Sequence, residues 1–223
     1  MERMMRAAAP AALALALAGP VRAHPAWPEG FVVRLEAMAR LQSLNAELLS
    51  HPSATATLQA FCDRHGAHPG LKVMARRLPE PDKAAGPEVR RDLQVGPQTP
   101  LRYRRVALTC GEVVLSQADN WYRPDRLTTE MNRLLDETQT PFGVAVAPLA
   151  YRRVTLSASL LAHPLPEGWE NQPPEANASP LTLPADVLQH RAVLIGADGA
   201  PISLVVETYS ASLLAPMIGA STP

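Results

Sequence analysis

Two strand-like runs joined by only two residues place the strongest constraint on this fold. The runs cover residues 101–110 and 113–122, and Gly111 and Glu112 are all that separates them. A two-residue connection permits a hairpin but is too short for a crossover, so the two strands are expected to pair antiparallel.

The C-terminal part of the chain predicts a second hairpin. Strand-like residues 191–195 and 201–209 flank Gly-Ala-Asp-Gly at 196–199, which is a strong turn signal. Two further strands are expected over 71–78 and 151–161.

Helices are predicted by apolar residues spaced three and four apart and by capping hydroxyls. They are expected over 31–49, 53–64, 128–137 and 183–189, with Ser53 and Thr128 as caps. The predicted fold class is therefore α+β: a single domain built on an antiparallel β-sheet.

Arg104 has an unexpected position in the first hairpin. It alternates with Val106, Leu108 and Cys110 and so shares the face that these apolar residues should bury. A buried guanidinium costs several kcal/mol unless an anion compensates it. Either a protein carboxylate or an acidic ligand is therefore expected opposite Arg104.

Glu207 is the corresponding acidic residue, within the apolar run at 202–209. Burial would raise the pKa of its carboxyl unless a cation or donor compensates, and such a carboxyl can transfer a proton near neutral pH. The alternative is structural: Arg104 and Glu207 pair with each other or with another internal charge.

Charge and motif content narrow the function classes. The chain has 21 Lys and Arg against 21 Asp and Glu, so it offers no basic field for nucleic acid. It also lacks a Gly-rich phosphate loop and paired histidine ligands. We expect no nucleic-acid partner, no cofactor and no metal.

The N-terminus has the pattern of an export signal. Arg3 and Arg6 precede the apolar run 7–19, and Ala23 ends a small-residue cleavage pattern. The sequence therefore predicts a signal peptide over 1–23, with no lasting membrane anchor, and a monomeric domain over 24–223 in the periplasm or secreted. The alternative is a cytoplasmic protein with an Ala-rich extension.

The two cysteines, Cys62 and Cys110, could serve one of three structural roles. An oxidising compartment would permit a bridge, but two small buried apolar side chains are the favoured reading. A zinc site of Cys62, His65 and His68 has ligand-like spacing, although these residues read better as a helix end and turn.

Four short segments in order resemble the chorismate pyruvate-lyase family. They are Ser-Ala-Thr at 53–55, the strand around Arg104, Thr-Pro-Phe-Gly at 140–143 and the strand around Glu207. The resemblance covers roughly residues 48–214. It implies an α+β fold in which helices cover an enclosed ligand pocket on the sheet.

The resemblance also implies site roles. Arg104 would hold a substrate carboxylate, Glu207 would act at the ring oxygen, and Ala54 and Phe142 would line the pocket. Chorismate would be cleaved to 4-hydroxybenzoate and pyruvate without a cofactor, a step of ubiquinone biosynthesis. This favours an enzyme whose catalytic residues are Glu207 and Arg104.

The chain departs from that family at Asn120, where an arginine is usual. Asn120 and Tyr122 are further candidates for pocket lining. Because a cation is absent and an exported lyase would rarely meet chorismate, a second function stays open. It is a non-catalytic exported binding protein for a small aromatic carboxylic acid on the same fold.

Overall fold

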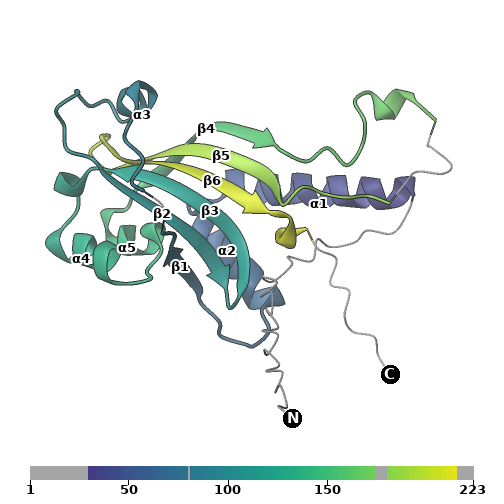
Figure 1. Cartoon of the computed structure of the whole chain (residues 1–223), viewed down its shortest axis with the longest axis horizontal. Helices are drawn as coiled ribbons and strands as arrows, with labels where there is room; N and C mark the ends of the chain where they lie inside the picture. Colours follow the sequence, from purple (N-terminus) through teal and green to yellow (C-terminus); the bar gives the residue numbers. More distant parts are fainter. Residues whose placement is uncertain (1–29, 80, 174–179, 215–223) are drawn as a thin grey trace, which may run out of the picture.

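A computed structural model describes residues 30–79, 81–173 and 180–214. They form one α+β domain around a six-stranded antiparallel sheet with strand order β1-β2-β3-β6-β5-β4 (Figure 1). The fold class expected from the sequence is confirmed, because hairpin connections join β2 to β3 and β5 to β6.

Five of the six strands follow the predicted positions closely, and β5 begins five residues earlier than predicted. They are β1 (Val73–Arg77), β2 (Arg102–Cys110), β3 (Val113–Tyr122), β4 (Arg152–Leu160), β5 (Asp186–Ile195) and β6 (Pro201–Ser210). The helix expected over 183–189 is wrong, since most of this segment belongs to β5. Both Val187 and Leu188 are fully buried there, and consecutive buried residues in a covered strand remove the alternation that identifies strands.

The main helices are α1 (Phe31–Ser50), α2 (Ala54–His65), α3 (Pro87–Asp92), α4 (Thr129–Glu137) and α5 (Phe142–Ala145). Both predicted caps are present: Ser53 Oγ accepts a hydrogen bond from the Ala56 amide, and Thr128 Oγ1 accepts one from the Met131 amide, each at 3.2 Å. These caps fix where α2 and α4 begin.

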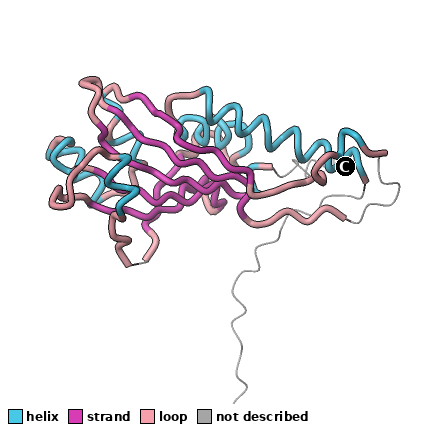
Figure 2. Tube along the Cα trace, turned by 90° about the horizontal axis from the view of Figure 1, so that it is seen from above, coloured by secondary structure: helices cyan, strands magenta, loops and turns pink. Residues whose placement is uncertain are grey.

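One face of the sheet, here called the inner face, carries α1 and α2 and most of the core. Figure 2 shows α1 running alongside the sheet. The register places Arg104 opposite Asn120, and Asn120 opposite Val205. Arg104 is therefore on the buried face, as its alternation with apolar residues predicts.

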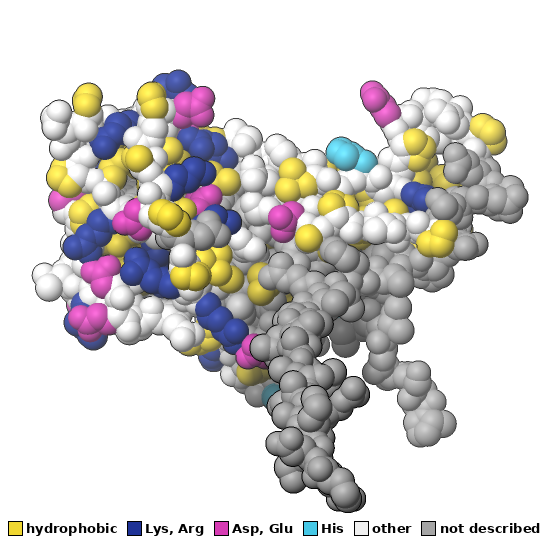
Figure 3. All heavy atoms as spheres, in the orientation of Figure 1, with side chains coloured by type: hydrophobic (Ala, Val, Ile, Leu, Met, Phe, Trp, Pro, Cys, Tyr) yellow, Lys and Arg dark blue, Asp and Glu magenta, His cyan; other side chains and the backbone are white. Residues whose placement is uncertain are grey.

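The opposite face has a smaller apolar cluster beneath α3. Trp121 and Leu204 of the sheet pack there with Val89 and Leu93. Together with the inner-face core, this cluster covers the middle of the sheet on both sides. Over the end of the molecule that carries α3 and α4, Figure 3 shows Lys and Arg side chains lying among Asp and Glu.

His190 fastens α1 to the sheet. Its Nε2–H donates to Asn45 Oδ1 of α1 at 2.8 Å, and its ring meets the Tyr209 ring edge-on with centroids 5.5 Å apart. The side chain is fully buried, and burial, aided by the nearby Arg153 cation, lowers the pKa of His190 from 6.5 to about 4. His190 is thus a neutral core residue.

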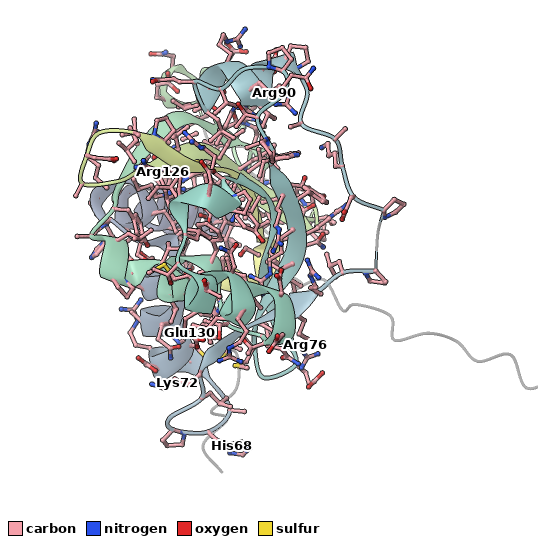
Figure 4. The ribbon with its side chains drawn as sticks, turned by 90° about the vertical axis from the view of Figure 1, so that its left-hand side faces the viewer. His68, Lys72, Arg76, Arg90, Arg126 and Glu130 are labelled. Carbon is pink, nitrogen blue, oxygen red and sulfur yellow. A yellow bond between two sulfur atoms is a disulfide. The ribbon has the colours of Figure 1, made fainter. Side chains whose placement is uncertain are left out.

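Cys62 and Cys110 form a disulfide with their Cα atoms 5.7 Å apart. The favoured reading of two unpaired cysteines is therefore wrong, because pairing depends on a distance that the sequence does not show. A zinc site with Cys62 is excluded, since its sulfur is already bonded. His68 lies in the loop between α2 and β1 (Figure 4).

The predicted signal peptide over 1–23 lies outside the described residues. Within the described ranges, no helix is both long enough and apolar enough to cross a membrane.

We predict that breaking the disulfide lowers the free energy of unfolding by about 4 kcal/mol, the value expected for a closed loop of this length, since 48 positions separate the two cysteines. Urea unfolding with and without a thiol reductant measures the loss. The double variant Cys62→Ala/Cys110→Ala should unfold at the same urea midpoint as the reduced wild type, and the reductant should not change this midpoint. Equal midpoints for oxidised and reduced wild type would contradict the prediction.

The buried His190 predicts a pH dependence of stability. Because its folded pKa is about 4, unfolded chains take up a proton as the pH falls below about 6.5 while folded chains do not. The free energy of unfolding should then fall by about 2–3 kcal/mol between pH 7 and pH 4.5. Urea unfolding of wild type and His190→Gln isolates this contribution, which the variant should lack. An equal loss in both proteins would refute it.

Candidate functional site

A cavity of about 50 Å³ lies between the inner face of the sheet and the starts of α2 and α5. The residues that line it come from five strands, β2 to β6, and from the two helix starts. They include Ser53, Ala54, Thr55, Arg104, Asn120, Phe142, Gly143, Tyr151, Arg153 and Glu207. The site is assembled from segments far apart in the sequence, because the strand order brings β2, β3 and β6 together.

Arg104 supplies the main unsatisfied charge of this cavity. The residue is 2% exposed, and its Nε and Nη1 have no hydrogen-bond partner among the described residues. Its Nη2 donates to the carbonyl oxygen of Thr138, at 3.5 Å. Burial, and next the nearby Arg77, lower the pKa of Arg104 to about 10, so it remains charged at neutral pH.

Glu207 is paired with Arg153. Arg153 Nη2 lies 2.6 Å from Glu207 Oε2, and the two side chains are 4% and 8% exposed. The Tyr209 hydroxyl donates to the same carboxylate oxygen at 3.1 Å. Of the structural alternatives, the one in which Glu207 pairs with another internal charge is therefore confirmed, and the Arg104–Glu207 pair is not formed.

Asn120 lies directly opposite Arg104 on β3 and is 4% exposed. Its Oδ1 has no hydrogen-bond partner within the described part of the chain. The position that departs from the lyase pattern thus holds a buried amide beside Arg104. An amide there can accept or donate one hydrogen bond to a bound molecule.

The first turn of α2 brings backbone amides to the cavity. Ala54 and Thr55 open the helix, and within the described ranges their N–H groups have no acceptor. The positive end of the α2 dipole therefore adds to the field of Arg104. Both contributions favour an anion in the cavity.

Most of the predicted site residues meet at this cavity. Arg104, Glu207, Ala54, Phe142 and Asn120 all line it.

Tyr122 is the predicted lining residue that lies elsewhere. Its hydroxyl hydrogen-bonds Arg102, and with Arg102 and Asp136 it lines a separate pocket. Its ring also contacts Phe142, with centroids 5.4 Å apart.

Arg153 is the functional residue that the sequence reasoning missed. In the sequence it follows Arg152 at the start of a predicted strand, and one charge of such a pair is expected in solvent and the other along the strand edge. On β4 the Arg153 side chain is buried, while the apolar Leu156 is 47% exposed at a register shift between Thr155 and Ser157. The apolar residues of this edge strand therefore do not mark its inward face. The sequence predicted that the buried Glu207 needs a cation beside it, but it did not identify Arg153 as that cation.

The cavity is small for a complete ligand. About 50 Å³ exceeds the ~10–15 Å³ that one water requires, but it is well below the ~150 Å³ cavity that holds benzene. It fits a carboxylate-sized group. A ring would require neighbouring elements to move.

Comparisons with known proteins found no matching family model. Among solved structures, the possible transcriptional regulator YydK of Bacillus subtilis shares 12% identity over 65% of this chain, with a TM-score of 0.43. This chain spans 60% of that protein. The effector domain of PhnF from Mycobacterium smegmatis shares 16% identity over 63% of this chain and 82% of that domain, with a TM-score of 0.42.

These structures correct the identification made from the sequence. Their names are those of a possible transcriptional regulator and of an effector domain, and the assignment to chorismate pyruvate-lyase is wrong, together with chorismate as substrate, its two products and ubiquinone biosynthesis. The alternative of an exported binder of aromatic carboxylic acids gains no support either, and the cavity has no room for a ring. With TM-scores below 0.5 the overlap is partial and assigns no ligand to this chain.

A comparison with curated sequences found a much nearer relative. The uncharacterized protein y4mC of Sinorhizobium fredii is 48% identical over 191 residues, which cover 84% of this chain and 81% of that protein. Identity at this level over this length shows common ancestry. The chain belongs to the same protein family as y4mC of Sinorhizobium fredii.

Proposed function

We propose that this protein binds a small carboxylic acid as its anion, with Arg104 as the anchor. The observation that carries the proposal is a buried guanidinium whose Nε and Nη1 have no partner among the described residues. A guanidinium donates in a planar fork that matches the two oxygens of a carboxylate.

The charge balance of the cavity supports an anion. Arg104 and Arg153 supply two positive charges, and Glu207 supplies one negative charge that Arg153 already neutralises. One positive charge is left on Arg104. A ligand with a single negative charge restores neutrality, whereas a neutral ligand leaves a buried cation uncompensated.

The neighbours of Arg104 support the same ligand class. The free amides at the start of α2 favour negative charge, and Asn120 offers an additional polar contact. In this proposal Ala54 and Phe142 shape the space around the bound group, while Glu207 holds Arg153 in place.

We further propose that the protein meets its ligand outside the cytoplasm. The disulfide between Cys62 and Cys110 supports this, because such bonds persist mainly in oxidising compartments. The export pattern over 1–23 points the same way.

Replacing Arg104 by methionine tests the proposed function. We expect acetate and propionate to bind Arg104→Met about 10- to 150-fold more weakly than wild type, because the variant loses a hydrogen bond to a charged group, and such a loss has this magnitude. Isothermal titration calorimetry and ligand-induced thermal shifts measure the change. Arg133→Met, which removes an exposed arginine of α4, is the matched control and should bind as wild type.

The same variant makes a second test without ligand. Arg104→Met should unfold at a urea concentration no lower than that of wild type, because it removes a buried charge that the fold leaves unpaired. Unchanged binding, or a loss of several kcal/mol of stability, would mean that Arg104 serves the fold and not a ligand.

A change at Glu207 should lower stability, in contrast to Arg104→Met. Glu207→Gln leaves the buried Arg153 without its counter-ion and should lower the free energy of unfolding by about 3–5 kcal/mol. The double variant Arg153→Met/Glu207→Gln should recover most of this loss. A urea double-mutant cycle measures the coupling. Additive single effects would disprove the pair's structural role.

A further inference from the structure

A second pocket of about 520 Å³ lies beside the cavity of Arg104. We call it the outer pocket. Its lining is mainly apolar and includes Val73, Met74, Pro141, Val144 and Ala147. Met74 and Val144 are 39% and 54% exposed, so the outer pocket presents apolar side chains to solvent.

The two pockets share one wall. Ser53, Thr55, Gly143 and Tyr151 line both of them. The wall is closely packed at Gly143, where a Cβ atom would lie 2.9 Å from the Tyr151 hydroxyl and 3.4 Å from Thr55 Oγ1, so a passage between the pockets requires the Tyr151 side chain to move. The Tyr151 hydroxyl also lies 3.5 Å from the Gly143 carbonyl oxygen.

We infer that the ligand is an amphipathic carboxylate with an unbranched alkyl tail. Its carboxylate binds Arg104 in the cavity, and its tail reaches the outer pocket past Gly143 when the Tyr151 side chain moves aside. This inference rests on the proposed function and adds the chemistry of the second half of the ligand.

The two halves of the site fit the two halves of such a molecule. The inner part is small, buried and positively charged, which suits a carboxylate. The outer part is ten times larger and mainly apolar, and a tail there would cover Met74 and Val144. A flexible chain suits the narrow wall better than a ring, which exceeds the space beside Arg104.

The reverse orientation has weaker support. Lys72 also lines the outer pocket and is exposed (Figure 4), so a carboxylate could in principle meet it at the rim. That arrangement would put an alkyl tail against the unpaired guanidinium of Arg104. A buried charge facing a hydrocarbon chain is unfavourable.

The test is a chain-length series by calorimetry on the oxidised wild type, using acetate, butyrate, hexanoate and octanoate. Affinity should rise about two- to fourfold for each added methylene that becomes buried. In the double variant Met74→Gln/Val144→Gln the rise should flatten, while acetate binds as before. Val113→Gln is the matched control, because Val113 is 50% exposed and does not line either pocket.

Each outcome has a distinct meaning. If acetate binds through Arg104 but chain length has no effect, the alkyl-tail inference is overturned and the proposed function stands. A rise that persists in Met74→Gln/Val144→Gln places the tail elsewhere and also overturns it. Failure of every carboxylate to bind defeats the proposed function itself. Octanoate binding that Arg104→Met leaves intact and Lys72→Met abolishes establishes the reverse orientation and overturns the one inferred.

Discussion

The site depends on one unbalanced charge on the buried face of the sheet. Arg104, Arg153 and Glu207 line the same cavity, and the close Arg153–Glu207 pair leaves the Arg104 guanidinium without a carboxylate bonded to it within the described structure. Burial lowers the pKa of Arg104 to about 10, yet the group stays protonated at neutral pH. The fold therefore retains a buried cation that destabilises it, and binding of an anion removes this cost.

Two elements of the fold, β2 and the start of α2, lie around that cation. β2 carries Arg104, and the start of α2 brings free amides to the same cavity. The disulfide joins these two elements, from Cys62 near the end of α2 to Cys110 at the end of β2. Asn45 and His190 fasten α1 to the sheet beside them. These contacts tie α1 and α2 to the sheet that carries Arg104.

Local signals predicted much of this arrangement. Alternation placed Arg104 on the buried face, the two-residue link required a hairpin, and Ser53 and Thr128 marked helix starts. The features that sequence reasoning missed depend on tertiary contacts. Arg153 lies inward on an edge strand whose apolar Leu156 faces out, and the disulfide requires a distance between segments that lie 48 positions apart. The lyase identification failed because short motifs placed the site residues but did not identify the ligand.

The most direct measurement follows the Arg104 guanidinium itself. In a ¹H–¹⁵N spectrum of the arginine Nε–H groups, the Arg104 signal is assigned by its loss in Arg104→Lys. Titration with acetate should shift this signal and slow its exchange with water, because the anion takes up an unpaired donor. If acetate shifts the signals of exposed arginines and leaves that of Arg104 unchanged, the cavity does not bind the anion and the account is wrong.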